Sequence, residues 1–181
     1  MMLTGIAPER VRRLILVAPV NFWSAHGKLL APFLCNPVIT PVVLWLLPRL
    51  DMLHEFYFRR LFGDTRRIRP GTLEGYMKPL LRRGGLANTM CVLRSWNRDL
   101  KDLKSILPCV SQVPTLMLWG SRDAAVNPAS ALELAKHFRE CQTIMLEGIG
   151  HLPYEEAPEE FNRIIAEFLM QERTARPQPR R

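Results

Sequence analysis

Two polar residues, Asp123 and His151, each follow an apolar run and a glycine, at places where a side chain could do acid–base chemistry. Asp123 ends the segment VPTLMLWGSRD, and His151 ends the segment QTIMLEGIGH. A carboxylate beside an imidazole fixes the tautomer of the ring and stabilises the imidazolium that forms when the histidine accepts a proton. The glycines allow a sharp exit from a strand and a close approach of backbones. The two residues are therefore a candidate acid–base pair.

Each residue also has a simpler interpretation when it is taken alone. Asp123 could be a turn residue whose carboxylate accepts hydrogen bonds from nearby backbone. His151 could be an ordinary loop histidine. The acid–base interpretation is favoured because both residues follow successive apolar runs. His26, His54 and His137 lack this context, and we interpret them as surface or packing residues.

The elements that would position this pair are strands alternating with helices. Three apolar runs are typical of short buried strands, and they cover residues 11–18, 113–120 and 142–150. Asn127 and Pro128 predict a helix start after the second run, and Pro158 predicts another after the third. The last helix has a core-facing stripe at helical spacing, made of Phe161, Ile164, Ile165, Phe168 and Leu169. This order predicts an α/β fold with a parallel sheet, whose ligands lie beyond the carboxyl ends of the strands.

The segment between the first two strands, residues 21–108, has a different pattern of apolar and polar residues. Apolar pieces broken by prolines alternate with basic, leucine-rich pieces, a pattern that predicts several short helices joined by loops. Residues 29–48 are apolar and long enough to cross a membrane. Their four prolines remove helix hydrogen bonds that lipid cannot replace, so we expect an apolar lid or a membrane-surface contact there, with the lid favoured.

Composition excludes several classes of function. A chain of 181 residues suits a single domain. Its net charge of +8 comes from scattered arginines that do not alternate with aromatic residues, so we expect no nucleic-acid partner. The four cysteines are widely spaced and form no zinc motif, which predicts buried free thiols, no metal site and no cofactor. The N-terminus lacks the apolar core of a signal peptide, and we expect a cytoplasmic location.

The segments PTLMLWGSRDAAVNP and IMLEGIGHLPYEEAPEEFNRIIAEFL resemble the C-terminal part of the α/β-hydrolase superfamily. The resemblance implies that Asp123 is the acid and His151 the base of a catalytic triad, in agreement with the chain order of such triads. It also implies a fold portion with about three parallel strands, flanking helices and a mainly helical cap. The core would comprise residues 1–20 and 109–171, the cap residues 21–108, and a basic disordered tail residues 172–181.

The sequence departs from that family at the nucleophile. In the family a serine lies on a G-x-S-x-G turn between a strand and a helix, and this chain has no such motif. Ser121 is rejected as a substitute because it lies on the same loop as Asp123. The opening MMLTGIAPERV resembles the end of the helix after the nucleophile, so we expect the chain to begin just past the missing turn. We also expect it to be marginally stable and almost inactive on its own.

Three hypotheses for function follow from these observations. The first is a hydrolase of an ester, amide, epoxide or carbon–carbon bond in a hydrophobic small molecule. In that case Val42, Trp45 and Leu46 line or cover the substrate pocket, or they are packing residues of the cap. The second is a non-catalytic module that binds a lipid-like ligand or another protein. The third is a peripheral membrane protein that uses residues 29–48. The sequence predicts neither the substrate nor the oligomeric state.

Overall fold

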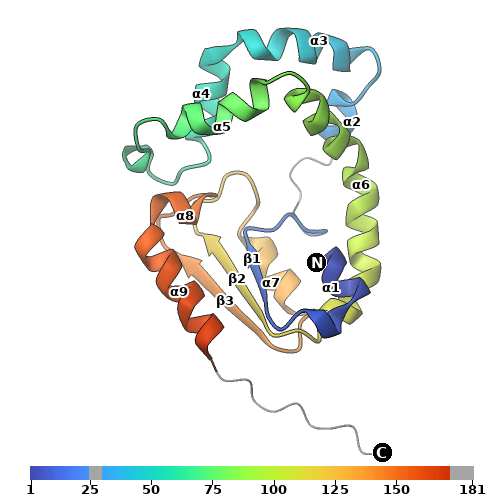
Figure 1. Cartoon of the computed structure of the whole chain (residues 1–181), viewed down its shortest axis with the longest axis vertical. Coiled ribbons are helices and arrows are strands. Elements are labelled where there is room, and N and C mark those ends of the chain that lie inside the picture. The colour runs from blue at the N-terminus through green and yellow to red at the C-terminus, as the bar shows by residue number, and fades with distance from the viewer. Residues whose placement is uncertain (25–29, 172–181) are drawn as a thin grey trace, which may run out of the picture.

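A sheet of three parallel strands forms the centre of the computed structural model, which describes residues 1–24 and 30–171 (Figure 1). The strands are β1 (Leu14–Val17), β2 (Thr115–Gly120) and β3 (Cys141–Leu146), and they lie in the order β1-β2-β3. Leu14 pairs with Thr115, and Thr115 pairs with Cys141. The predicted α/β class and the three parallel strands are confirmed. All three strands are shorter than predicted.

Helices lie on both faces of the sheet and beyond the carboxyl ends of its strands (Figure 1). The helices around the sheet are α1 (Met2–Ile6), α7 (Ala129–Ala135), α8 (Pro153–Glu156) and α9 (Pro158–Met170). Those of the intervening segment are α2 (Leu30–Leu34), α3 (Ile39–Leu46), α4 (Asp51–Arg59), α5 (Thr72–Leu81) and α6 (Gly85–Val110). Single turns of 3-10 helix occur at Pro8–Arg10, Leu47–Arg49 and Thr65–Arg67.

The central strand β2 is buried along its whole length. Leu116 and Leu118 pack with residues of α9, whereas Met117 packs on the opposite face with residues of α6 and α7. This alternation follows from the two-residue period of a strand. Full burial of one such side chain contributes about 1.5–3 kcal/mol, so β2 is the main anchor of the fold.

Strand β1 is less buried because, among the described strands, it has a neighbour on one side only. Leu16 is buried, while Leu14, Ile15 and Val17 are half-buried. The chain leaves β1 through Ala18, whose φ of 40° is positive and whose amide donates to the carbonyl of Leu118 at 2.8 Å. Steric strain in this backbone region explains why the strand ends there.

The two predicted helix starts after β2 and β3 are confirmed. The side chain of Asn127 accepts a hydrogen bond from the amide of Ala129 at 3.0 Å, which caps the first turn of α7. Helix α9 begins at Pro158 with glutamates in its first turn. Its predicted stripe is partly wrong: Ile164 and Phe168 are buried, but Leu169 is 53% exposed although Phe168 lies in the same turn.

The intervening helices α2 to α5 lie beyond the carboxyl ends of the strands, at the top of Figure 1. The prediction of several short helices is confirmed for residues 30–81, but it is wrong for α6, which is one helix of 26 residues. Helix α6 runs from this upper layer down to the sheet, where Leu107 and Val110 join the core. The expected boundary at residue 108 therefore falls inside a continuous helix.

All four cysteines are free thiols, as predicted, but they are not all buried. Cys91 and Cys109 are exposed on α6, and Cys35 and Cys141 are half-buried. Burial raises the pKa of the Cys141 thiol, which makes this cysteine a poor nucleophile. Among the described residues, no group of His, Cys, Asp and Glu side chains is arranged to hold a metal ion.

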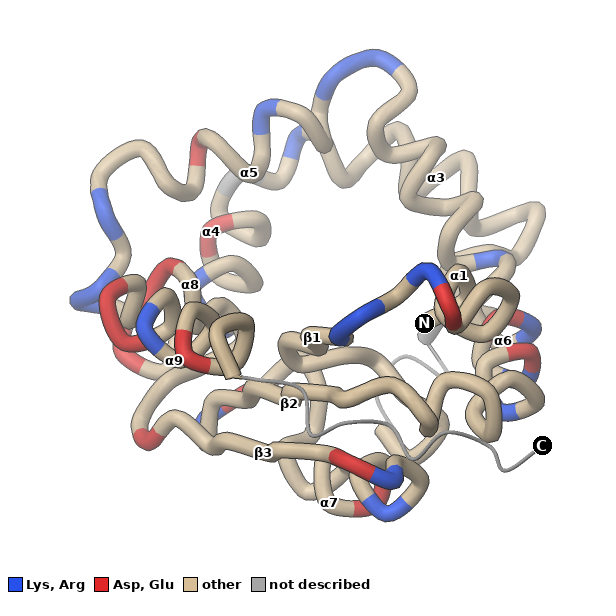
Figure 2. The backbone as a smooth tube through the Cα atoms, turned by 60° about the horizontal axis from the view of Figure 1, so that its bottom comes forward, with Lys and Arg blue, Asp and Glu red and all other residues tan. Residues whose placement is uncertain are grey.

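Charged residues occupy the helices and loops around the sheet, whereas the strands carry few of them (Figure 2). The arginines are scattered in space as they are in the sequence. No helix in residues 1–24 and 30–171 is both long and apolar enough to cross a membrane. His26 and the tail at 172–181 lie outside the described residues.

Candidate active site

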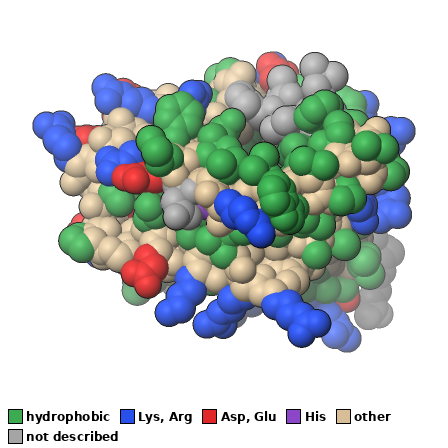
Figure 3. All heavy atoms as spheres, turned by 90° about the horizontal axis from the view of Figure 1, so that it is seen from above, with side chains coloured by type: hydrophobic (Ala, Val, Ile, Leu, Met, Phe, Trp, Pro, Cys, Tyr) green, Lys and Arg blue, Asp and Glu red, His purple; other side chains and the backbone are tan. Residues whose placement is uncertain are grey.

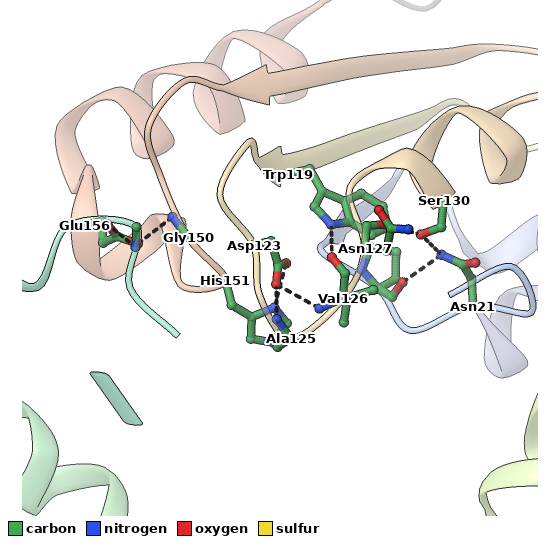
Figure 4. A network of polar contacts seen from close by, with 12 residues as sticks. Asn21, Trp119, Asp123, Ala125, Val126, Asn127, Ser130, Gly150, His151 and Glu156 are labelled. Carbon is green, nitrogen blue, oxygen red and sulfur yellow. Dashed lines mark hydrogen bonds and ion pairs between the residues drawn. The ribbon is translucent and has the colours of Figure 1, made fainter. Parts of the chain in front are cut away.

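Asp123 and His151 lie in hydrogen-bond contact at the carboxyl ends of β2 and β3 (Figure 4). The Nδ1 atom of His151 lies 2.8 Å from Oδ2 of Asp123. Because β2 and β3 are adjacent and parallel, the loops that follow them leave the sheet at the same edge. The structure thus brings together the two residues that the sequence singled out.

The carboxylate of Asp123 is fixed by two backbone donors as well as by His151. Its side chain has no exposed surface, and Oδ1 accepts hydrogen bonds from the amides of Ala125 and Val126, each at 2.8 Å. The indole of Trp119 in turn donates to the carbonyl of Val126 at 3.1 Å. The carboxylate therefore makes both kinds of contact: Oδ1 accepts from the backbone of its own turn, and Oδ2 contacts the imidazole.

The imidazole of His151 is held on one side and open on the other. Its Nδ1 contacts Asp123, whereas Nε2 makes no hydrogen bond to any described residue. The side chain is 25% exposed, so a proton can reach Nε2 from outside. The backbone amide of His151 donates to the carbonyl of Leu61 at 2.6 Å. A ring anchored through Nδ1 by a buried carboxylate has the geometry of a general base that acts through Nε2.

Three glycines allow backbones to pack directly against each other beneath this pair. A Cβ atom on Gly150 would lie 2.3 Å from the carbonyl oxygen of Leu61, and one on Gly120 would lie 2.1 Å from that of Gly150. A Cβ on Gly63 would lie 2.4 Å from the carbonyl oxygen of Gly148. The close approach predicted for Gly120 and Gly150 is confirmed. Gly63 was not anticipated, because nothing in the segment LFGD indicates its distant partner.

Glu156 is the main site residue to which sequence reasoning gave no role. It is only 7% exposed, and its carboxylate accepts hydrogen bonds from three backbone amides. These donors are Gly150 at 2.6 Å, Gly63 at 3.0 Å and Asp64 at 3.2 Å. Glu156 therefore ties the loop of His151 to the loop that follows α4 (Figure 4). In the sequence it looks like one more acidic residue at a helix start.

Asn21 fixes the loop after β1 against the start of α7. It is fully buried, and its side-chain amide donates to Oγ of Ser130 at 3.0 Å (Figure 4). Its side-chain oxygen Oδ1 accepts hydrogen bonds from the backbone amides of Trp23 at 2.9 Å and Ser24 at 3.0 Å. This network sets the edge of the site beside Asp123, and sequence reasoning missed it because asparagine in a loop carries no specific signal.

The remaining residues singled out by the sequence lie elsewhere. Oγ of Ser121 accepts a hydrogen bond from the amide of Gly148 at 2.9 Å, which gives this serine a structural role in holding the two loops together. Val42, Trp45 and Leu46 lie on α3 with exposed fractions of 55%, 62% and 40%. None of the contacts within the described chain joins them to Asp123 or His151, and their role in binding substrate stays a prediction.

Two perturbed side chains lie near the site without joining the acid–base pair. The hydroxyl of Tyr76 on α5 donates to Oε1 of Glu155 at 3.0 Å, and burial together with hydrogen bonds to Tyr154 and Glu155 raises the pKa of Tyr76. Asp64 accepts hydrogen bonds from Arg66, which lower the pKa of its carboxyl to about 2. These contacts stabilise the layer above the strands.

Comparison with known proteins decides the family. A sequence profile described as "Alpha/beta hydrolase family" matches residues 1–164 of this chain. The chain belongs to that alpha/beta hydrolase family. In such hydrolases the triad residues follow in the order nucleophile, acid, histidine, so the positions of Asp123 and His151 agree with the family.

Individual relatives in the family match this chain over part of their length. The chain is 27% identical over 172 residues to the dihydrolipoyllysine-residue acetyltransferase component of the acetoin cleaving system of Pseudomonas putida, of which it covers 40%. It resembles the solved structure of Cfl2 from Burkholderia cenocepacia with a TM-score of 0.72 at 16% identity. It resembles an esterase of Thermogutta terrifontis with a TM-score of 0.67 at 24% identity. The match to Cfl2 covers 91% of this chain and 59% of Cfl2. The match to the esterase covers 92% of this chain and 58% of the esterase.

Proposed function

We propose that Asp123 and His151 are the acid and base of a serine-type triad in a carboxylic ester hydrolase. The observation that carries this proposal is the 2.8 Å contact between the buried carboxylate and the Nδ1 atom of His151 at the ends of adjacent strands. The 181 residues contain no G-x-S-x-G turn, so the nucleophile and the oxyanion hole belong to residues outside this sequence.

In the proposed reaction His151 moves protons at Nε2 while Asp123 stays ionised. His151 accepts the proton of the serine hydroxyl as that oxygen attacks the ester carbonyl, and Asp123 stabilises the imidazolium across the Nδ1 contact. The imidazolium then gives the proton to the departing alkoxide. In the second half of the cycle His151 takes a proton from water, whose oxygen attacks the acyl group and releases the acid.

The names of two relatives favour an ester over an amide, an epoxide or a carbon–carbon bond. The chain is 36% identical over 58 residues to the human monoacylglycerol lipase ABHD6 and 37% identical over 49 residues to Lipase 1 of Psychrobacter immobilis. Both names denote enzymes that cleave acyl esters of hydrophobic molecules. We infer the same class of substrate here and a cytoplasmic location. We also infer that residues 21–108 form the cap and residues 1–20 and 109–171 the core, except that the last turns of α6, with Leu107, belong to the core.

Transplanting the pair tests its catalytic role. Residues 11–170 are grafted onto the N-terminal part of the Thermogutta terrifontis esterase, and turnover of p-nitrophenyl esters is measured. We expect an active chimera whose kcat falls by a factor of about 10⁴ on Asp123→Asn. The control Asp102→Asn should leave kcat unchanged. A folded, active chimera that tolerates Asp123→Asn and His151→Ala contradicts the assignment.

The 181-residue polypeptide alone provides a separate test. It should hydrolyse the same esters no faster than buffer does, because neither a nucleophile nor oxyanion donors are present to complete the triad. Robust turnover that disappears on His151→Ala would show that the chain holds a complete site.

A further inference from the structure

Helix α3 is apolar on nearly all sides, so large apolar side chains face solvent as well as the protein. Val38, Val42, Trp45 and Leu46 recur at the spacing of one helix face, and their exposed fractions range from 40% to 78%. The polar residue Thr40 is instead buried, and its hydroxyl donates to the carbonyl oxygens of Leu34 at 2.9 Å and Asn36 at 3.0 Å. Ile39, Val43 and Leu44 are half-buried beside Thr40, and a row of large apolar side chains is left outside.

Helix α4 extends this apolar face. Met52 is 88% exposed and Phe56 is 54% exposed. A hollow at the start of α4 is lined by Arg49, Leu50, Met52, Leu53 and Phe56. The name "cap apolar surface" is used below for Val38, Val42, Trp45, Leu46, Met52 and Phe56. Figure 3 shows hydrophobic side chains gathered over this side of the molecule, with Lys and Arg among and around them.

Two arginines lie over aromatic rings of this surface, and α4 also carries the acids Asp51 and Glu55. Residues 30–50 contain no aspartate or glutamate, and their only charged residue is Arg49. The guanidinium of Arg49 lies 4.6 Å from the ring centroid of Trp45, and that of Arg60 lies 5.8 Å from the ring centroid of Phe56. Neither arginine forms an ion pair with a described carboxylate. The nearby Glu55 is bound instead by Arg59 at 2.7 Å.

We propose that the cap apolar surface docks on a phospholipid membrane that contains anionic lipids. Aromatic rings with a cation beside them suit the boundary between acyl chains and headgroups, since the ring enters the apolar layer while the guanidinium reaches lipid phosphates. Helix α3 has eight residues and rises about 12 Å, which is too short to cross a bilayer of about 30 Å. It lies along the surface, and the cations select anionic headgroups.

This proposal is independent of the catalytic assignment. Asp123 and His151 lie at the strand ends, whereas the docking surface is built from α3, α4 and residues next to them. Loss of the acid–base pair therefore leaves membrane binding unchanged, and loss of membrane binding leaves the acid–base pair unchanged.

Vesicle co-sedimentation of the full chain tests the proposal. We expect binding to vesicles of equal parts phosphatidylcholine and phosphatidylglycerol at low salt, weaker binding to pure phosphatidylcholine, and a decrease as salt rises. Trp45→Ser should weaken the partition coefficient by about tenfold, because it removes the largest inserted side chain. Arg49→Gln should weaken it by about fivefold on anionic vesicles only.

A matched variant controls for loss of exposed apolar area in general. Leu169 on α9 is 53% exposed and lies near the far end of that helix from the cap, so Leu169→Ser should leave partitioning unchanged. Equal binding by Trp45→Ser and Leu169→Ser overturns the proposal. Absence of vesicle binding at low salt also overturns it. A lipid-free oligomer that Trp45→Ser dissociates, without vesicle binding, would assign the surface to a second copy of the chain.

Discussion

Replacing Glu156 by glutamine should destabilise the protein more than its small change in shape suggests. The two carboxylate oxygens accept hydrogen bonds from the amides of Gly63, Asp64 and Gly150. Glutamine offers one acceptor oxygen, and its NH2 group would point at backbone donors. At least one buried amide is then left without an acceptor, at a cost of about 1–3 kcal/mol. The remaining bonds lose the contribution of the negative charge, which is about 1 kcal/mol.

The expected loss for Glu156→Gln is therefore about 3 kcal/mol, a large fraction of the roughly 5–15 kcal/mol that stabilises a typical domain. Equilibrium unfolding in urea measures it as a lower midpoint at unchanged slope. The matched control is Glu147→Gln on the exposed turn after β3, which should change the free energy of unfolding by less than about 0.5 kcal/mol.

A structural readout separates the role of Glu156 from general destabilisation. Amide hydrogen exchange of Gly63 and Gly150 in native conditions should accelerate in Glu156→Gln relative to amides of β2, because the two loops separate before the sheet opens. If the variant unfolds with the same free energy as Glu147→Gln, the hydrogen bonds of Glu156 contribute nothing net and the reasoning is refuted.

Two further predictions follow from single sites. Gly150→Ala should lower the free energy of unfolding by about 3 kcal/mol or more, because the new Cβ would lie 2.3 Å from the carbonyl oxygen of Leu61. The control is Gly75→Ala in α5, whose Cβ meets open space and which should raise the free energy of unfolding by about 0.5–1 kcal/mol. Thermal melts compare the two, and equal melting temperatures would contradict the close packing at Gly150. The carboxyl of Asp64 should titrate near its lowered pKa of about 2. Its pKa in the unfolded chain is about 3.9, so its contribution to stability is fully present above about pH 3.9 and is lost as the pH falls toward 2. NMR titration should find this midpoint, and Arg66→Gln should return it toward the unfolded value; an unchanged midpoint would show that Arg66 is not the cause.

The acid–base pair could be found from sequence because each residue follows a strong local signal. An apolar run that ends in glycine predicts where a strand stops, and Asp123 and His151 stand directly after such points. Parallel pairing of β2 and β3 then brings the two together without further information. The two bonds of Oδ1 to Ala125 and Val126 also follow from the local turn.

The contacts that support the pair could not be found in this way, because their partners lie far apart in the chain. Glu156 binds Gly63 and Asp64 across more than 90 positions, and neither segment carries a pattern that indicates the other. The prediction of short helices is wrong for α6, in which Pro108 is the only proline. It is tolerated in the last turn, where Leu107 is already packed on the sheet.

The apolar composition of residues 29–48 predicted an apolar lid or a membrane contact, but it did not indicate which side of the helix is exposed. Periodicity alone cannot say which side of a helix faces the protein, and in α3 Thr40 is buried while Val42 and Trp45 are exposed. The predicted substrate contacts Val42, Trp45 and Leu46 are therefore exposed side chains, which is where the membrane proposal begins.

The pairing of Leu14 with Thr115 joins two neighbouring strands across roughly 100 residues of intervening chain. Closing such a loop costs about 4 kcal/mol of chain entropy, yet doubling its length adds only about 0.6 kcal/mol. Insertions and deletions among α2 to α5 are thus nearly neutral for the sheet, provided that the segment around Gly63 still reaches Glu156. The helices above the strands are free to diverge in length and sequence, while the geometry of Asp123 and His151 stays constant.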